Sequence, residues 1–216
     1  NGSRYGTHNM ANLCNLSYDV LRQAEKNHLR IETLHAANDA ISNATAQLPI
    51  FKYYNIQEDK LHASYDGQRF ESRFNTISTN FCSKYFGRGK GVSAVSLIAN
   101  HIPVSAKMMG LNGHESYYLY DLLFNNTSDI QPDVISTDNH GTNQFNFALL
   151  DLAGWSFAPR YVNVGKVLAG LFTYTEDQNG ITIALSKPIN TKLIESDWPL
   201  IQQIMVSLHS KQCSQA

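Results

Sequence analysis

Apolar and polar residues follow two different periods along the chain, and each period predicts a different kind of element. Across residues 17–48 the apolar side chains recur at steps of three, four or seven, which is the spacing of a helix face. The best-spaced positions are Ile31, Leu34, Ile41 and Leu48. Pro49 ends the pattern, because proline pushes the residue before it out of the helical region. We expect a helical lead-in that packs on the segments after it.

From Leu61 the period becomes two, which is typical of a strand. Apolar side chains alternate with polar ones up to Tyr65, so the pattern predicts a strand that ends at Asp66. Residues 92–99 and 102–109 predict two further strands that are separated by a turn. Three strands in succession favour an antiparallel meander.

Helices and strands alternate after the meander. Residues 114–125 have helical spacing, and residues 134–137 predict a short buried strand that delivers Asp138 at its end. Thr142 is a candidate cap for the next helix, which Gly154 is expected to end.

Residues 155–162 then predict a fifth strand. The predicted order is three strands, a helix, a strand, a helix and a strand. This is the order of the ribonuclease H-like fold, which is an α/β fold with a mixed sheet. Members of that fold place acidic residues at the ends of the adjacent first and fourth strands. Asp66 and Asp138 fall on those two predicted strands.

The pattern divides the chain into three parts. Residues 1–58 are the helical lead-in, residues 59–164 the ribonuclease H-like core, and residues 165–216 part of a truncated insertion. In the third part, Asn179 and Gly180 predict a hairpin, and a last helix is expected to start near Pro199.

Composition narrows the class of protein. The 216 residues carry a net charge of −1, and no stretch approaches the roughly 18 apolar residues of a membrane span. Cys14, Cys82 and Cys213 have no paired spacing, so neither a disulfide framework nor a zinc site is predicted. We expect a soluble cytoplasmic protein without a membrane partner.

Asp66 and Asp138 together form the candidate catalytic centre. Two carboxylates held close together repel each other unless a cation lies between them. Mg²⁺ prefers carboxylate oxygens and keeps positions open for water and phosphate, so it fits such a pair. Either aspartate alone is more often a turn residue or a helix cap, but their placement on two adjacent strands favours a metal site.

A cationic block lies between the two aspartates. Residues 72–114 contain no Asp or Glu. Within them, the glycines of residues 84–91 allow the backbone to approach a phosphate closely. Tyr85 and Phe86 in the same run could stack on an unpaired base. The alternative is a flexible turn with solvated charges. The predicted DNA-phosphate contacts are Arg69, Arg73, Lys84, Arg88, Lys90 and Arg160.

Six short motifs, in order along the chain, resemble the Tn3 family of bacterial replicative transposases. They are Glu32-Thr-Leu-His-Ala-Ala-Asn, Leu48-Pro49, Ser64-Tyr-Asp-Gly-Gln-Arg-Phe, Lys84-Tyr-Phe-Gly-Arg-Gly-Lys-Gly, Ser136-Thr-Asp-Asn-His-Gly and Phe157-Ala-Pro-Arg. The resemblance runs from about residue 10 to the end of the chain. It is far more specific than any one of the motifs.

This resemblance implies a catalytic domain taken from a much larger transposase with an Asp-Asp-Glu triad. Such enzymes nick transposon-end DNA with water to release a 3′-hydroxyl and then join that hydroxyl to target DNA. Asp66 and Asp138 match the first two acids of the triad. The implied cofactor is Mg²⁺, for which Mn²⁺ can substitute, and the implied full-length protein is a bacterial, nucleoid-associated homodimer.

The third acid has no match in the chain. Glu176, Glu195 and Asp197 follow the predicted fifth strand, but none stands in a context that resembles the family. The third acid is therefore expected beyond residue 216. A two-metal site is expected only when that acid is present, and this fragment alone should be inactive.

Two alternative functions stay open at this point. A nuclease or resolvase of the same fold would hydrolyse DNA without joining it. A non-catalytic module would bind DNA through the cationic block and show no metal-dependent chemistry.

Overall fold

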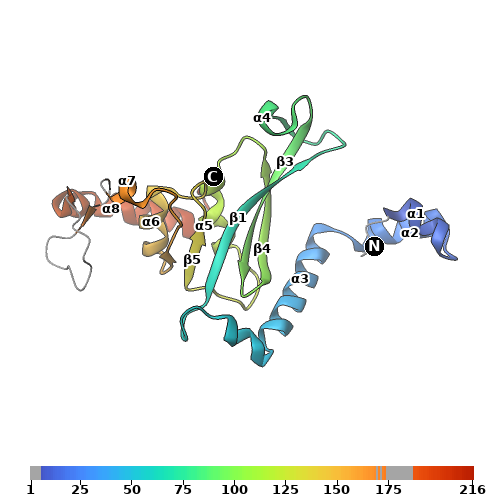
Figure 1. Cartoon of the computed structure of the whole chain (residues 1–216), viewed down its shortest axis with the longest axis horizontal. Helices are drawn as coiled ribbons and strands as arrows, with labels where there is room; N and C mark the ends of the chain where they lie inside the picture. Colours follow the sequence, from blue (N-terminus) through green and yellow to red (C-terminus); the bar gives the residue numbers. More distant parts are fainter. Residues whose placement is uncertain (1–5, 169, 171, 174–186) are drawn as a thin grey trace.

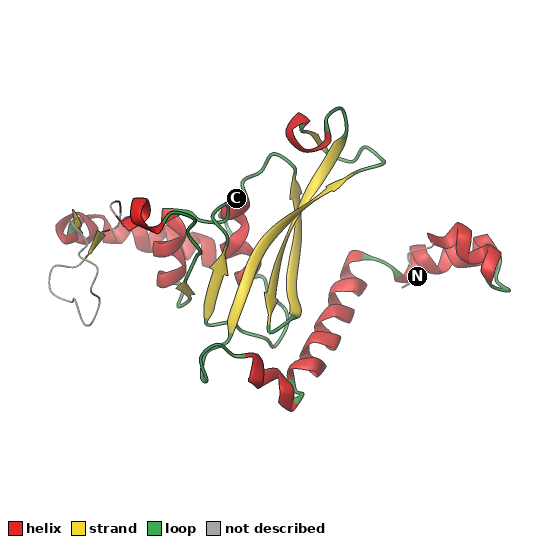
Figure 2. Cartoon of the chain, in the orientation of Figure 1, coloured by secondary structure: helices red, strands yellow, loops and turns green. Residues whose placement is uncertain are grey.

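The computed structural model describes residues 6–168, 170, 172–173 and 187–216 of the chain (Figure 1). Its centre is a mixed β-sheet with helices beside it, which makes the chain an α/β protein, as predicted (Figure 2). Within the described part of the chain, no helix combines the length and apolar character needed to span a membrane.

The helical lead-in consists of several helices. They are α1 (Gly6–Leu13), α2 (Tyr18–His28), α3 (Ile31–Ala46) and the 3-10 helix η1 (Pro49–Tyr54). Residues 17–48, which were predicted to be helical, form two helices that are separated at Leu29 and Arg30. The Thr33 hydroxyl accepts a hydrogen bond from the Arg30 amide, which gives that amide a partner at the start of α3.

The lead-in packs on the sheet, but through its polar face. Asn38 and Ser42 of α3 donate side-chain hydrogen bonds of 3.1 and 3.0 Å to the carbonyl oxygen of Pro103 in strand β4 (Ile102–Gly110). Ile31 and Ile41, which belong to the predicted apolar face, are 71% and 67% exposed. The packing was predicted correctly, and the face that makes it was not.

The main sheet has the connectivity that positions the site. Its strands are β1 (His62–Glu71), β2 (Asn80–Phe81), β3 (Lys90–Ala99), β4, β5 (Val134–Thr137) and β6 (Ser156–Phe157). β1 pairs antiparallel with β3, and β3 pairs antiparallel with both β2 and β4. On its other edge β1 pairs in parallel with β5, which in turn pairs in parallel with β6. The three long strands β1, β3 and β4 are the predicted antiparallel meander.

Two strand boundaries differ from the prediction. β1 continues five residues beyond Asp66, because its pairing with β3 extends as far as Glu71 opposite Gly91. The fifth strand is only Ser156–Phe157, although the amides of Ala158 and Arg160 still donate to carbonyl oxygens of β5 at 2.8 Å. Pro159 lies between those two residues and has no amide hydrogen to continue a regular ladder.

After β1 the described chain contains the short helix α4 (Ser83–Phe86), the 3-10 helix η2 (Glu115–Tyr118) and the helices α5 (Leu119–Phe124), α6 (Gln144–Leu152), α7 (Val164–Leu168) and α8 (Thr191–His209). Buried side chains of α5, α6 and α8 belong to the core on one face of the sheet, whereas α4 lies at the distal end of the β1–β3 ribbon (Figure 1). The cap of α6 is Asn143, whose side chain accepts from the Phe145 amide, and not Thr142 as predicted. Gly154, with φ of +89°, follows the helix as expected.

The last helix starts earlier than predicted. Asn190 caps α8 by accepting a hydrogen bond from the Leu193 amide, and Pro199 lies inside the helix. Short strands β7 (Phe172–Thr173) and β8 (Lys187–Pro188) precede it, while the predicted hairpin turn at Asn179 and Gly180 lies outside the described residues.

The hydrophobic core lies between the sheet and the helices α5, α6 and α8. Its members are buried side chains of β1, β3, β4 and β5 on one side and of the helices on the other. Tyr65, Leu97 and Ile135 come from the sheet, and Leu150 and Leu208 come from α6 and α8. The end of α8 therefore packs on the same core as the sheet, and Figure 1 shows α6 and α8 on the same side of the sheet.

Candidate functional site

Asp66 and Asp138 are brought side by side by the parallel pairing of β1 with β5. The last aligned pair of these strands is Tyr65 with Thr137, so the two aspartates occupy the next position on each chain. One pair earlier, the hydroxyl oxygens of Ser64 and Ser136 lie 3.3 Å apart, which puts both serines on the same face. Side chains two residues apart on a strand share a face, and neighbouring strands lie about 4.8 Å apart. Both carboxylates therefore occupy one face at one end of β5.

The face that carries the two aspartates is open to solvent. Asp66 and Asp138 are exposed. On the same face, Ile98 of β3 is 42% exposed and Met108 of β4 is 58% exposed. The opposite face holds the hydrophobic core. A ligand can therefore reach the two carboxylates without any movement of the core.

Asp138 is held in a tight turn after β5. Its Oδ1 accepts hydrogen bonds from the amides of His140 at 2.9 Å and Gly141 at 3.1 Å, and its Oδ2 lies 3.1 Å from Nδ1 of His140. The hydroxyl of Thr142 donates to the Asp138 carbonyl oxygen at 3.1 Å. A Cβ on Gly141 would overlap the side chain of Thr137, so only glycine fits this turn.

The same hydrogen bonds favour the ionised form of Asp138. Partial burial raises the pKa of this carboxyl, but the hydrogen bonds from the His140 side chain and from the Gly141 and His140 amides outweigh it. The pKa of Asp138 therefore lies below its usual value of 3.8. At neutral pH the group is a carboxylate, which is the form that binds a cation.

Two adjacent carboxylates suit a hard divalent cation but supply only part of its ligand set. Asp66 adds a second carboxylate, whose Oδ1 accepts a 2.8 Å hydrogen bond from the Gly67 amide. Oxygen donors of this kind are those that Mg²⁺ takes, with water and phosphate in the remaining positions. Within residues 6–168 and the other described residues, no group of three or more His, Cys, Asp or Glu side chains could hold a metal.

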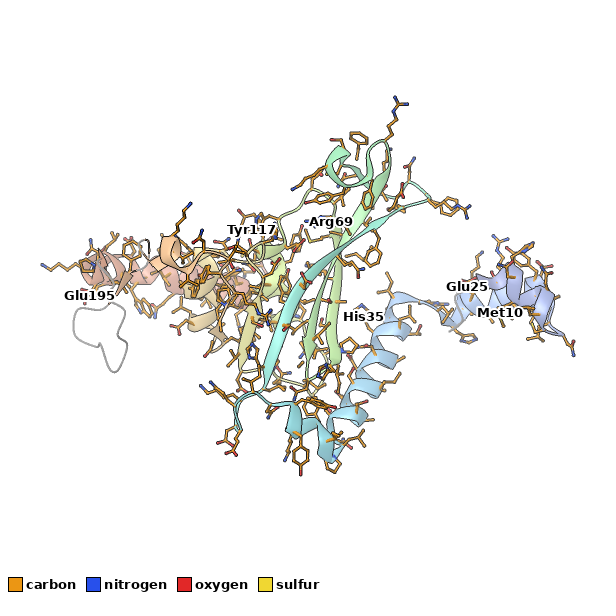
Figure 3. The ribbon with its side chains drawn as sticks, in the orientation of Figure 1. Met10, Glu25, His35, Arg69, Tyr117 and Glu195 are labelled. Atoms are coloured by element: carbon orange, nitrogen blue, oxygen red, sulfur yellow. The ribbon has the colours of Figure 1, made fainter. Side chains whose placement is uncertain are left out.

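The candidate third acids that the structure describes, Glu195 and Asp197, do not join this pair. Glu195 lies on α8, and Figure 3 shows it at the far end of that helix, well away from Arg69 and β1. Asp197 lies on the same helix, and Glu176 is outside the described residues.

Arg69 is not a free cation on the surface. Its Nη2 lies 3.0 Å from Oε1 of Glu115, and its guanidinium lies 4.2 Å from the centre of the Tyr85 ring. Figure 3 shows Arg69 near the segment that carries Tyr117, which follows Glu115 closely in the chain. The guanidinium of Arg69 is therefore shared with Glu115 and Tyr85, and its phosphate contact stays a prediction.

Four of the remaining predicted phosphate contacts lie around the distal end of the β1–β3 ribbon. Arg73, Lys84, Arg88 and Lys90 are all exposed there. Arg160 is exposed after β6, and its charge adds to burial in lowering the pKa of His62 on β1. These placements leave the five side chains accessible to a polyanion.

The two aromatic residues of the glycine-rich run are engaged within the protein. Phe86 packs against Gly91 so closely that a Cβ on the glycine would overlap the ring. Tyr85 has Arg69 over one part of its ring and the Lys84 amine 5.1 Å from its centre. The prediction that both rings are available to stack on bases is therefore weakened, most of all for Phe86.

Glu115 is the residue that sequence patterns missed. It is 6% exposed, although an isolated glutamate after a turn is ordinarily read as a surface residue. The only sequence signal was its position at the start of a helical pattern after the third strand.

Comparisons with known proteins identify the family of the chain. The family model of the Tn3 transposase DDE domain matches residues 1–216. The transposase for transposon Tn4556 of Streptomyces fradiae is 27% identical over 196 residues, which are 90% of this chain and 22% of that protein. The transposase for transposon gamma-delta of Escherichia coli (strain K12) is 28% identical over 164 residues, which are 73% of this chain and 16% of that protein.

Among solved structures, the crystal structure of the Mos1 Strand Transfer Complex covers 97% of this chain and 72% of its own, with 9% identity and a TM-score of 0.35. The chain spans less than a quarter of the length of the two curated relatives. Because the family model covers every residue, the chain belongs to the Tn3 transposase DDE domain family.

Proposed function

We propose that this chain is the catalytic core of a DNA transposase with a ribonuclease H-like fold. The observation that carries the proposal is the β1–β5 register, which sets Asp66 beside Asp138 on an open face of the sheet. The family membership of the chain supports the same reading. The reaction is cleavage of transposon ends to free 3′-hydroxyls, followed by transfer of those ends into target DNA.

Asp66 and Asp138 would hold Mg²⁺ or Mn²⁺ in this proposal. The chemistry that a cation held by these two carboxylates would supply is activation of the attacking oxygen and stabilisation of the leaving oxygen of a phosphodiester. The His140 side chain and the Gly141 amide keep the Asp138 carboxylate ionised and fixed in orientation. The third carboxylate and the second metal position would come from a part of the full-length protein outside these 216 residues.

The five exposed cations would bind DNA backbone. No acid among the described residues forms an ion pair with any of them, and four of the five lie together at the end of one β-ribbon. The five are Arg73, Lys84, Arg88, Lys90 and Arg160. Such contacts position a duplex and do not read its sequence. In this proposal residues 1–58 are the lead-in, residues 59–164 the catalytic core and residues 165–216 part of an insertion, and the full-length protein acts as a homodimer.

The test is a reaction of the full-length protein with a transposon-end duplex and a target duplex in Mg²⁺. Wild-type protein should nick the end and join it covalently to the target. Asp66→Ala and Asp138→Ala should each abolish both products while DNA binding is retained. Nicked but never joined product from the wild type would favour a nuclease, and full cleavage by either variant would exclude the assignment.

A further inference from the structure

Strand β1 loses one of its two neighbours at Asp66. From Ala63 to Tyr65 it is paired with β3 on one edge and β5 on the other. From Asp66 to Glu71 its pairing in the described structure continues with β3 alone. The backbone that carries Asp66 therefore lies at the point where support from β5 ends.

Glu115 contacts β1 at three positions around this point, all from the core face. The Tyr65 hydroxyl donates a 2.6 Å hydrogen bond to the backbone oxygen of Glu115. Gly67 lies directly against the Glu115 carboxyl group, where a Cβ on the glycine would overlap it. Arg69 completes the set with its 3.0 Å ion pair to Oε1. These odd-numbered residues flank Asp66, which points to the opposite face.

Burial makes the Glu115 contacts specific. The Glu115 side chain is 7% exposed and that of Arg69 is 29% exposed, and the ring of Tyr85 covers the guanidinium. Desolvation can cancel the attraction within a buried ion pair, so such a pair is weak evidence for a gain in stability. The burial of the Glu115 carboxylate is better explained by the part of β1 that it holds in position.

The geometry points to Glu115 as a positioning residue that fixes Asp66 opposite Asp138. Glu115 contacts the strand at Tyr65, Gly67 and Arg69, on both sides of Asp66. These contacts replace the support that β5 gives to the earlier part of the strand. Removal of a group that orients a metal ligand typically costs about 10–100-fold in metal affinity or activity. This inference rests on the proposed function, because it concerns the same metal site.

The neighbouring ion pair offers a matched control. Lys107 of β4 lies 3.5 Å from Asp121 of α5, with side-chain exposures of 43% and 7%. This pair also joins the sheet to the segment after β4, but it contacts β4 and not β1. Lys107→Met should therefore loosen the same helical segment without releasing Asp66.

The experiment measures Mn²⁺ binding to the full-length protein by titration followed with electron paramagnetic resonance. The signal assigned to the site is the binding that Asp66→Ala removes. Glu115→Gln keeps the size of the side chain and loses its charge, and it should weaken that binding by about tenfold with DNA affinity unchanged. Amide hydrogen exchange in metal-free protein should rise over residues 66–71 in Glu115→Gln and stay at the wild-type level there in Lys107→Met.

If Glu115→Gln does not fold, Arg69→Lys provides the second test. It keeps a positive charge beside Glu115 but loses the guanidinium that packs on Tyr85, so a smaller loss in the same direction is expected. Wild-type Mn²⁺ affinity and wild-type exchange over residues 66–71 in the folded variant would overturn the role of Glu115. An Mn²⁺ titration of Asp66→Ala that is unchanged from the wild type would instead overturn the proposed metal site itself.

Discussion

Gly67 lies against the carboxyl group of Glu115 so closely that no side chain fits between them, since a Cβ on Gly67 would overlap the carboxyl carbon. Gly67 directly follows Asp66, and Glu115 is buried on the core side of the sheet. The glycine is therefore required by space on the face opposite the two aspartates, and its backbone is in an ordinary strand conformation.

Gly67→Ala should destabilise the protein by about 1–3 kcal/mol, because an extra methyl group would be forced into a filled space. Urea unfolding of the variant measures this loss. Gly165→Ala is the matched control, since a Cβ at Gly165 meets no atom within 4 Å and alanine favours its helix. Equal unfolding midpoints for the two variants would contradict the close contact at Gly67.

Gly141→Ala should disturb the turn that holds Asp138. The added methyl group would overlap the Thr137 side chain, and the Gly141 amide would lose its hydrogen bond to Asp138 if the turn opened. We expect a loss of stability of about 1–3 kcal/mol together with weaker Mn²⁺ binding. Thr137→Ala in the same chain should restore part of both, because it removes the overlapping hydroxyl. Failure of this second change to restore either property would argue against the steric cause.

His140→Ala should raise the pKa of Asp138 toward its usual value of 3.8, since the side-chain hydrogen bond is the largest of the effects that lower it. The carboxyl carbon of Asp138, followed by NMR as pH is varied, reports this directly. A depressed pKa stabilises the folded state above the unfolded value, and this contribution is lost as pH falls through the folded value. Acid unfolding of His140→Ala should accordingly depend less on pH below about 4 than that of the wild type.

Replacement of Lys84, Arg88 and Lys90 by alanine should weaken DNA binding by the full-length protein to all sequences alike. Each lost phosphate contact should reduce the slope of log affinity against log salt by about 0.9. Lys192→Ala on the exposed α8 is the control and should leave the slope unchanged. A loss confined to one DNA sequence would indicate base contacts in place of phosphate contacts.

The sequence pattern predicted the strands that carry the two aspartates because their core-facing residues are apolar. Ala63 and Tyr65 on β1 and Ile135 on β5 are all buried, and their spacing of two is visible in the sequence. The pattern lost β1 after Asp66 because the core-facing positions there are Gly67 and Arg69. Neither residue signals burial, although the strand continues.

Pairing with Glu115 explains both that loss and why the ion pair of Arg69 could not be predicted. A charged residue is read as exposed unless its partner is known, and Glu115 is distant in sequence from the strand it contacts. The packing face of α3 was missed for a similar reason, since Asn38 and Ser42 bind a backbone carbonyl group that no apolar pattern reveals.

The most direct test of the central claim, that Asp66 and Asp138 form one metal site, is a count of Mn²⁺ ions bound by the full-length protein and by Asp66→Ala, Asp138→Ala and the double variant. A shared site predicts that each single change removes the same bound ion and that the double variant loses no more than either single variant. Losses that add in the double variant, or an unchanged count in either single variant, would contradict a shared site.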